Sequence, residues 1–277
     1  MPGAFTPAPV GFNIVTILAN INSGEVVFDS SAPIEDATAR IGVAAIGLSR
    51  TLNLAGRYSN VTVVVPYFRA HLEGLLADEF RETSRSGLGD STVRLGVNLY
   101  GAPAMTPKEF AAYRPSTVLS VSFTVGLPTG QYYPDKVINI GTNRWAFRPE
   151  VGLARTRGRW TIEGDFSTGF FTDNTNYLST STRAQSPIFA GQWHLIYTVR
   201  PGMWVAGDGN YWNGGRFTVD GVEAPLKQKN SRLGLTLALP IARQQFRIAY
   251  SYGAYTTIGG AYKSLGLSYS YAWFGRP

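Results

Sequence analysis

The chain has 277 residues, of which 16% are charged, below the roughly 25% of an ordinary soluble domain. No run approaches the roughly 20 apolar residues that a membrane helix needs, so the composition excludes a bundle of membrane-spanning helices. A mean hydropathy of −0.05, with 31 glycines and 13% aromatic residues, is typical of a membrane β-barrel, because lipid-facing and water-facing residues alternate along its strands.

The charge and cysteine content exclude other classes. The chain has no cysteine, which rules out disulfide bonds and thiol chemistry. Its formal net charge of +7 comes from scattered basic residues, so we expect no nucleic-acid partner. Two interpretations of this charge stay open, namely solvated loops and a lumen that favours anions. Residues 1–11 lack a secretory signal, and we expect that such a signal has been removed.

Alternation of apolar and small polar residues is the main structural signal. In residues 116–127, Leu119 and Val121 lie on one face of a predicted strand and Ser120 and Ser122 on the other. A soluble sandwich also alternates. A barrel is favoured because the polar face is continuous, connections alternate between short and long, and tryptophans gather near strand ends as in an interfacial girdle. These tryptophans are Trp145, Trp160, Trp193, Trp204, Trp212 and Trp273.

We predict an all-β protein, a transmembrane antiparallel up-and-down barrel of twelve strands in which residues 1–277 form a single domain. The predicted strands are 9–22, 37–52, 58–72, 90–101, 116–128, 143–156, 159–172, 186–199, 203–213, 229–240, 245–257 and 261–274. Short turns are predicted at 54–57, 157–158, 200–202 and 241–244. Longer loops are predicted at 23–36, 73–89, 129–142, 173–185 and 214–228.

One short helix is predicted near residues 106–113, on the side of the short turns. Thr106, Pro107 and Glu109 match an N-cap, a proline in the first turn and the acidic residue of a capping box, and the helix should end before Pro115. It is interpreted either as a surface helix or as a partial plug of that mouth of the barrel.

Charged residues within the predicted strands should mark the inner face, because an Arg or Lys facing lipid at mid-membrane costs about 2–4 kcal/mol. The predicted lumen and constriction residues are Arg94, Arg144, Arg148, Glu150, Glu163, Asp165, His194, Asp208, Arg232 and Arg247. We expect a ladder of Arg–carboxylate pairs, bidentate where Arg takes part. The ladder either holds the shape of the barrel or selects solutes by charge.

No catalytic, metal or cofactor site is predicted. The chain has two histidines, and His194 lies on the inner face with no serine at a compelling spacing for a hydrolase. No Cys/His cluster suits zinc. Glu163 and Asp165 lie two residues apart on one predicted strand, which favours ion pairing over a glycosidase pair.

Several blocks of sequence resemble one family of outer-membrane proteins. They include Gly87-Leu88-Gly89-Asp90, Gly126-Leu127-Pro128-Thr129-Gly130-Gln131-Tyr132, Arg148-Pro149-Glu150 and Tyr211-Trp212-Asn213-Gly214-Gly215. This is the family named for the MetA pathway of phenol degradation, and the resemblance runs from about residue 87 to the C-terminus. It implies a transporter-like barrel for uptake of aromatic or other hydrophobic compounds. At most ten residues precede the first predicted strand, too few for the N-terminal plug of fatty-acid-type transporters.

We therefore expect a channel of the bacterial outer membrane for small aromatic or hydrophobic molecules, with membrane lipid and the solute as its partners. The candidate loop aromatics that would stack on a solute, or anchor the chain at the membrane interface, are Tyr132, Tyr133, Phe171 and Tyr177. Two alternatives stay open, namely a structural or adhesive barrel with a filled lumen and an outer-membrane enzyme. Oligomeric state is left open.

Overall fold

The structure is a computed structural model. It describes residues 2–28, 34–76, 78–114, 116–242 and 244–275. Pro115 and residues 29–33 of the predicted 23–36 loop lie outside the described residues.

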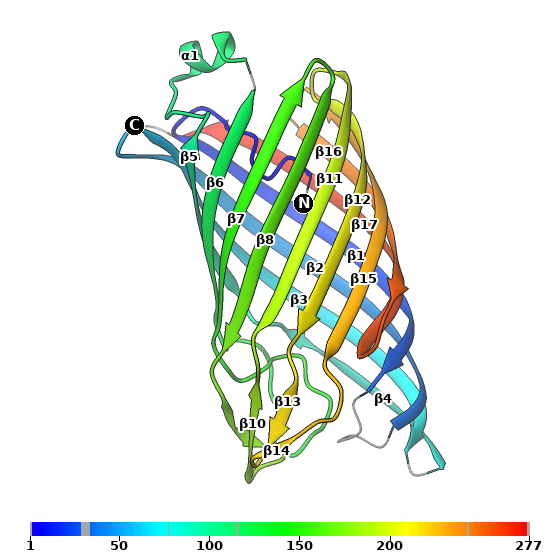
Figure 1. Ribbon diagram of the computed structural model, residues 1–277. Helices are drawn as coiled ribbons and strands as arrows, with labels where there is room; N and C mark the ends of the chain where they lie inside the picture. Colours follow the sequence, from blue (N-terminus) through cyan, green and yellow to red (C-terminus); the bar gives the residue numbers. More distant parts are fainter. Residues whose placement is uncertain (1, 29–33, 77, 115, 243, 276–277) are drawn as a thin grey trace.

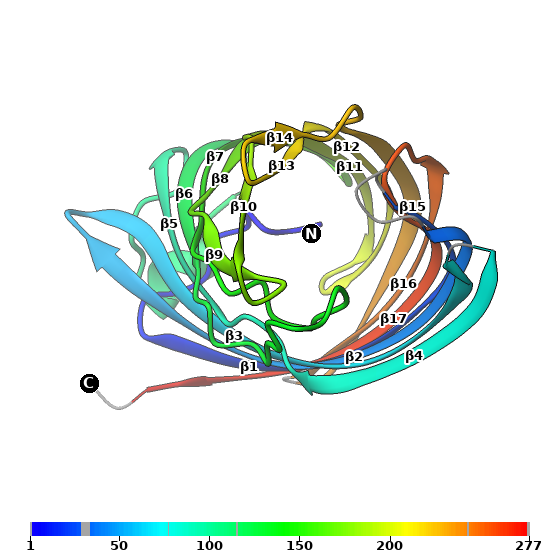
Figure 2. The same ribbon diagram turned by 90° about the horizontal axis from the view of Figure 1, so that it is seen from below.

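Within the described residues, thirteen strands fill twelve positions of a closed antiparallel barrel wall, which confirms the predicted architecture (Figures 1 and 2). The first strand, β1 (Phe12–Val27), pairs with β2 (Ile34–Leu54) on one side and with β17 (Gly259–Phe274) on the other. The remaining wall strands are β3 (Arg57–Leu76), β4 (Glu79–Leu88), β5 (Thr92–Tyr100), β6 (Thr117–Gly126), β7 (Ala146–Arg157), β8 (Trp160–Phe171), β11 (Ile188–Arg200), β12 (Met203–Gly214), β15 (Gln228–Ile241) and β16 (Gln244–Tyr255).

Strands β4 and β5 together fill one position in the wall. The C-terminal half of β3, from Tyr67 onward, pairs with β4, whereas Ser59–Val64 pair with β5. The prediction of a loop at 73–89 is therefore wrong, because β3 and β4 continue there as a hairpin. This hairpin extends past the roughly ten residues that span a bilayer. Beyond the membrane both faces of the hairpin can be exposed to water, so its residues need not alternate between apolar and polar. Hydrogen bonds between the backbones of the two strands stabilise the hairpin there.

The outer face of the wall is apolar. Ile162 and Leu235 are each 63% exposed, and they belong to a belt of exposed aliphatic and aromatic side chains that runs across the strands. Such a belt is stable when lipid covers it. Trp145, Trp160 and Trp273 lie exposed near strand ends, as predicted for a girdle.

Trp204 and Trp212 depart from that girdle. Both share the inward parity of Asp208 on β12 and line cavities of the lumen. The girdle prediction is therefore wrong for these two residues, because position near a strand end does not fix which face a side chain takes. Trp193 also departs from it: it is exposed on the outer face but lies in the middle of β11.

The two ends of the barrel differ. The "turn end" carries the short connections β2–β3, β7–β8, β11–β12 and β15–β16 together with the helix α1 (Figure 1). The "cap end" carries a four-stranded sheet and the irregular segment 127–145 around the mouth (Figure 2). The cap strands are β9 (Asn174–Tyr177), β10 (Ser181–Gln185), β13 (Phe217–Val219) and β14 (Val222–Glu223).

The helix α1 (Pro107–Ala112) has the predicted capping box and no buried residue. The Tyr113 hydroxyl donates to the carbonyl oxygen of Gly101 at 2.7 Å, which ties its end to the rim beside β5. It is a surface helix, and the interpretation as a plug is wrong. No helix in the described part of the chain is long and apolar enough to cross a membrane.

The N-terminal segment, residues 2–11, instead enters the lumen from the turn end (Figures 1 and 2). Phe5 is 3% exposed and packs with Tyr58, Val118 and Ala154 on three wall strands. A segment shorter than the plug of fatty-acid-type transporters thus still lies within the lumen. One aromatic side chain seated against the wall holds the segment in the lumen.

Candidate channel lumen

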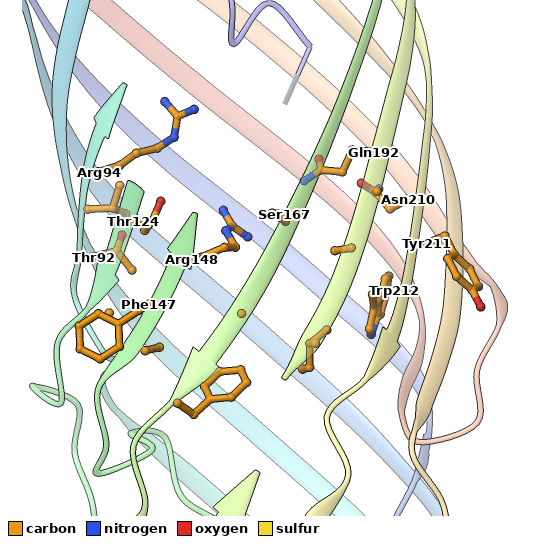
Figure 3. A pocket seen from close by; sticks show the side chains of 18 of the residues that line it. Thr92, Arg94, Thr124, Phe147, Arg148, Ser167, Gln192, Asn210, Tyr211 and Trp212 are labelled. Atoms are coloured by element: carbon orange, nitrogen blue, oxygen red, sulfur yellow. The ribbon is translucent and has the colours of Figure 1, made fainter. Parts of the chain in front are cut away.

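Three adjoining cavities run through the barrel. The first, of about 620 Å³, lies toward the cap end and is lined by Arg94, Arg148 and Trp212 (Figure 3). The second, of about 550 Å³, shares Thr62 and Val64 with the first. The third, of about 680 Å³, surrounds the N-terminal segment at the turn end. It shares Gln245 and Arg247 with the second, so the three cavities lie next to one another along the barrel.

Strand register brings polar side chains into rows across the charged wall. Asp165, Gln192, Asn210 and Arg232 are paired from strand to strand on β8, β11, β12 and β15. Because side chains alternate along each strand, all four lie on the same face. Gln192 and Asn210 are seen together on this wall in Figure 3.

Arg94 and Glu150 form an ion pair in this wall. Arg94 Nη2 donates to Glu150 Oε1 at 2.8 Å, and the Ser122 hydroxyl donates to the same oxygen at 3.0 Å. The Glu150 side chain is 9% exposed and that of Arg94 is 22% exposed. Charge-assisted hydrogen bonds of this kind are stronger than neutral ones, so the pair fixes the spacing of β5, β6 and β7.

A second cluster joins β11, β12 and β15. His194 Nδ1 lies 2.6 Å from Asp208 Oδ1, and the Thr236 hydroxyl donates to Asp208 Oδ2 at 2.6 Å. His194 is 3% exposed, and its Nε2 has no hydrogen-bond partner within the described residues. The cluster links three neighbouring strands and acts as a cross-strand brace.

Glu163, Arg232 and Arg247 each have a neutral group among their hydrogen-bond partners. Glu163 Oε2 accepts from the backbone nitrogen of Gly3 at 2.8 Å, and Arg232 Nη1 donates to the Ser264 hydroxyl at 3.2 Å. Arg247 donates to Gln245 Oε1 at 2.8 and 3.0 Å. Its guanidinium lies 5.4 Å from the ring centre of Trp204.

The expectation of a ladder of bidentate Arg–carboxylate pairs is therefore wrong. Among the described wall residues, Arg94–Glu150 is the one such pair within 4.0 Å, and a single pair of atoms makes it. The reason is spacing, because hydroxyl and amide side chains from the neighbouring strands stand between the charges and take up their hydrogen bonds. Of the ten predicted lumen residues, the four arginines within strands equal the carboxylates in number, and Arg114 and Arg159 line the 680 Å³ cavity in addition.

Arg144 lies outside this wall, in the segment before β7 at the cap end. Its guanidinium stacks over the ring of Phe171 at 4.4 Å and donates to Gln185 Oε1. Phe171 is the last residue of β8 and lines the 620 Å³ cavity. Phe171 therefore lies beside the lumen, and its stacking on a solute stays a prediction.

The other three predicted stacking aromatics lie in the cap. The Tyr132 hydroxyl donates to the Asn176 carbonyl at 3.1 Å and accepts from Asn174 Nδ2 at 2.8 Å. Tyr177 lines the same small cap cavity as Tyr132, whereas Tyr133 is 44% exposed. The structure therefore brings Tyr132 and Tyr177 together and leaves Tyr133 at the surface.

Sequence reasoning missed two features of the site. One is the apolar wall made by inward-facing Phe12, Ile14 and Leu18 of β1, which line the 550 Å³ cavity. In β1 both faces are largely apolar, so alternation gave no signal there. The other is Arg183 in β10, which lies in a segment that reads as a loop. Its neighbouring hydroxyl and amide residues carry no periodic signal.

Solved structures share this fold. An outer membrane channel from Pseudomonas putida F1 superposes with a TM-score of 0.82 at 19% identity, covering 99% of each chain. The β domain of the Bordetella autotransporter BrkA gives a TM-score of 0.54 at 12% identity, covering 95% of this chain and 100% of that one. A toluene transporter from Pseudomonas putida gives 0.50 at 10% identity, covering 96% and 90%. At these identities the similarity establishes the fold alone.

No sequence among the curated proteins matches this chain. The sequence pattern of one family does match it, over residues 36–271, which is most of the barrel and its cap. The chain therefore belongs to the family described as "Putative MetA-pathway of phenol degradation".

Proposed function

We propose that this protein is an outer-membrane channel that passes small molecules bearing an aromatic or hydrophobic part. The observation that carries the proposal is the pair of unlike walls around the lumen. The β1 side presents Phe12, Ile14 and Leu18, while the side from β5 to β15 presents charged and amide groups such as Arg148 and Gln192. A solute with an apolar body and a polar substituent is matched on both sides.

The apolar outer belt and the arrangement of the ends support a place in the outer membrane. Bacterial barrels have short periplasmic turns and longer extracellular loops. We therefore assign the turn end to the periplasm and the cap end to the outside, with the whole chain acting as a single membrane domain. Solute then meets the cap first and the N-terminal segment last.

The class of solute rests on similarity. The family is named for phenol degradation, and one protein of similar fold is described as a toluene transporter. In this chain Phe171 and Trp212 line the entrance cavity and offer ring faces to an aromatic solute. Arg94, Arg148 and Glu150 would orient its polar substituent within the narrow part of the path. A transport role of this kind requires no catalytic residue.

The decisive experiment is single-channel conductance of the refolded protein in a planar bilayer, combined with uptake of phenol into protein-containing liposomes. We expect discrete conductance steps and phenol uptake above that of empty liposomes. A correctly folded barrel that shows neither would overturn the proposal and favour a filled, structural barrel.

Variants of the apolar wall test the role of the unlike walls. Ile14→Ser combined with Leu18→Ser should lower phenol uptake while leaving ion conductance at or above its wild-type value, because the path widens but loses apolar contact. Thr16→Ser is the matched control, because Thr16 faces the same cavity and keeps its hydroxyl. Equal uptake by all three proteins would show that the apolar wall does not recognise the solute.

A further inference from the structure

A small cavity of about 180 Å³ lies in the cap, apart from the three cavities of the lumen. Two arginines from different segments line it, Arg144 before β7 and Arg183 in β10. Its other walls include aromatic side chains of Tyr132, Tyr177 and Phe217. The cavity therefore combines two cationic groups with ring faces.

Arg183 is held between two rings. Its guanidinium lies 3.9 Å from the ring centre of Phe217 and 5.0 Å from that of Tyr177. The Nε atom of Arg183 is buried and has no hydrogen-bond partner within the described residues. A buried donor without an acceptor costs free energy, so the site is incomplete as it stands.

Arg144 is fixed beside it by contacts on its other side. Its guanidinium stacks on Phe171 and donates to Gln185 Oε1, while the amide nitrogen of Gln185 donates to the carbonyl of Gly215 at 3.0 Å. Burial, and then the neighbouring charge of Arg183, lower the pKa of Arg144 to about 10. The guanidinium remains charged at neutral pH.

The charges of Asp90 and Asp173 act on Arg144 through space, but neither carboxylate forms an ion pair with it among the described residues. Asp90, whose charge acts on Arg144 from a distance, accepts instead from the backbone nitrogen of Gly130 at 2.9 Å and from the nitrogen and hydroxyl of Thr142 at 2.9 and 2.6 Å. In the described residues, no carboxylate oxygen lies within 4.0 Å of either guanidinium. Two neighbouring, partly buried guanidinium groups without a paired carboxylate repel each other, and an anion bound between them would relieve this repulsion.

We propose that this cap cavity binds the carboxylate of a small aromatic acid, with the carboxylate between Arg144 and Arg183 and the ring against Tyr177 and Phe217. Arginine suits a carboxylate because its planar fork can donate two parallel hydrogen bonds. A volume of about 180 Å³ is below the 300–1,000 Å³ of pockets for drug-sized ligands, so it suits a single-ring solute.

This inference rests on the proposed channel function and narrows its solute class to aromatic anions. Arg144 faces the cap cavity and also stacks on Phe171, which lines the lumen entrance. An anion captured at the cap is therefore held next to the 620 Å³ cavity. At the cap, two arginines line one cavity without an ion-paired carboxylate among the described residues, so we assign the capture of the anion to the cap.

Binding of benzoate, benzyl alcohol and acetate to the purified protein in detergent, measured by calorimetry, tests the site. We expect benzoate to bind about tenfold or more tightly than either benzyl alcohol, which lacks the charge, or acetate, which lacks the ring. Arg183→Gln should weaken benzoate binding about tenfold. Arg216→Gln is the matched control, because Arg216 lies in the same cap but pairs with Glu223 at 3.0 Å. Equal binding by wild type and R183Q, or equal binding of benzoate and acetate, would overturn the assignment.

Thermal unfolding gives a second measurement, which distinguishes loss of the binding site from a failure of the variant to fold. Benzoate should raise the Tm of the wild type and of R216Q but not that of R183Q, and without benzoate R183Q should unfold no earlier than the wild type. Phe217→Leu should reduce the preference for benzoate over acetate. A benzoate-induced shift of equal size in R183Q would overturn the site.

These outcomes separate the site from the channel. Uptake of phenol without preferential binding of benzoate would support the proposed channel function and overturn the proposed anion site. Benzoate binding that depends on Arg183, in a protein without conductance, would support the proposed anion site and overturn the proposed channel function.

Discussion

The ring of Phe5 occupies the space above Gly152 on β7, where a β carbon would overlap the ring. The same side chain is buried against Tyr58 and Val118, so the N-terminal segment is seated on the wall at the turn end of the lumen. Phe5 can pack here because residue 152 has no side chain. This glycine therefore determines whether the N-terminal segment stays in the lumen at the turn end.

Gly152→Ala should therefore displace Phe5 and release the segment from the barrel wall. We expect a larger single-channel conductance and faster cleavage of residues 2–11 by an added protease. Gly164→Ala on β8 is a suitable control, because its β carbon would meet its nearest neighbour at 3.7 Å, an ordinary contact. If G152A has unchanged conductance and its N-terminal segment resists protease as in the wild type, the packing of Phe5 on Gly152 does not hold the segment in the lumen.

The Arg94–Glu150 pair should contribute to barrel stability. Glu150→Ala leaves a half-buried guanidinium without its carboxylate, and we expect a loss of about 1–3 kcal/mol in the free energy of unfolding. Urea unfolding in lipid vesicles measures this. The double variant Arg94→Met, Glu150→Ala should be less destabilised than the sum of the single variants, because no charge is then left unpaired. Additive losses would show that the two side chains do not interact.

Two adjacent tyrosines should behave differently in the cap. Tyr132→Phe removes the hydroxyl that bonds Asn174 and Asn176, and we expect faster proteolysis of the cap and a cost of about 1 kcal/mol. Tyr133→Phe is the matched control, because that side chain is exposed and its hydroxyl contacts only Gln131 in the described residues. If both variants show the same proteolysis rate, Tyr132 does not hold the cap.

The capping box of α1 should give a pH dependence at the rim. Hydrogen bonds from Thr106, the backbone one first, lower the pKa of Glu109 below its usual value. The stabilisation from this carboxylate is present above the unfolded pKa of Glu109 and is lost as pH falls through its lowered folded pKa. Hydrogen exchange at the Phe110 amide should therefore accelerate in acid, relative to reference amides of β7. Thr106→Ala should abolish the difference between neutral and acidic pH, and a difference retained in this variant would exclude the capping box as its source.

The sequence by itself determined the barrel, its twelve strands and the short helix. A residue that faces lipid must be apolar, whereas its neighbour on the strand need not be. The alternation of Leu119 in β6 and of Leu235 in β15 with small polar residues therefore predicts these wall strands directly. The capping box at Thr106 was equally visible because it depends on residues three positions apart.

Only the tertiary structure decided what occupies the lumen and the cap. Inward parity placed Arg94 and Glu150 on one face, but their pairing depends on strand register and on Ser122 between them. The seat of Phe5 on Gly152 joins residues far apart in sequence, and neither carries a local signal. Arg144 and Arg183 meet only because two separate connections fold over the same mouth. These contacts arise from closure of the barrel, which periodicity along one strand does not encode.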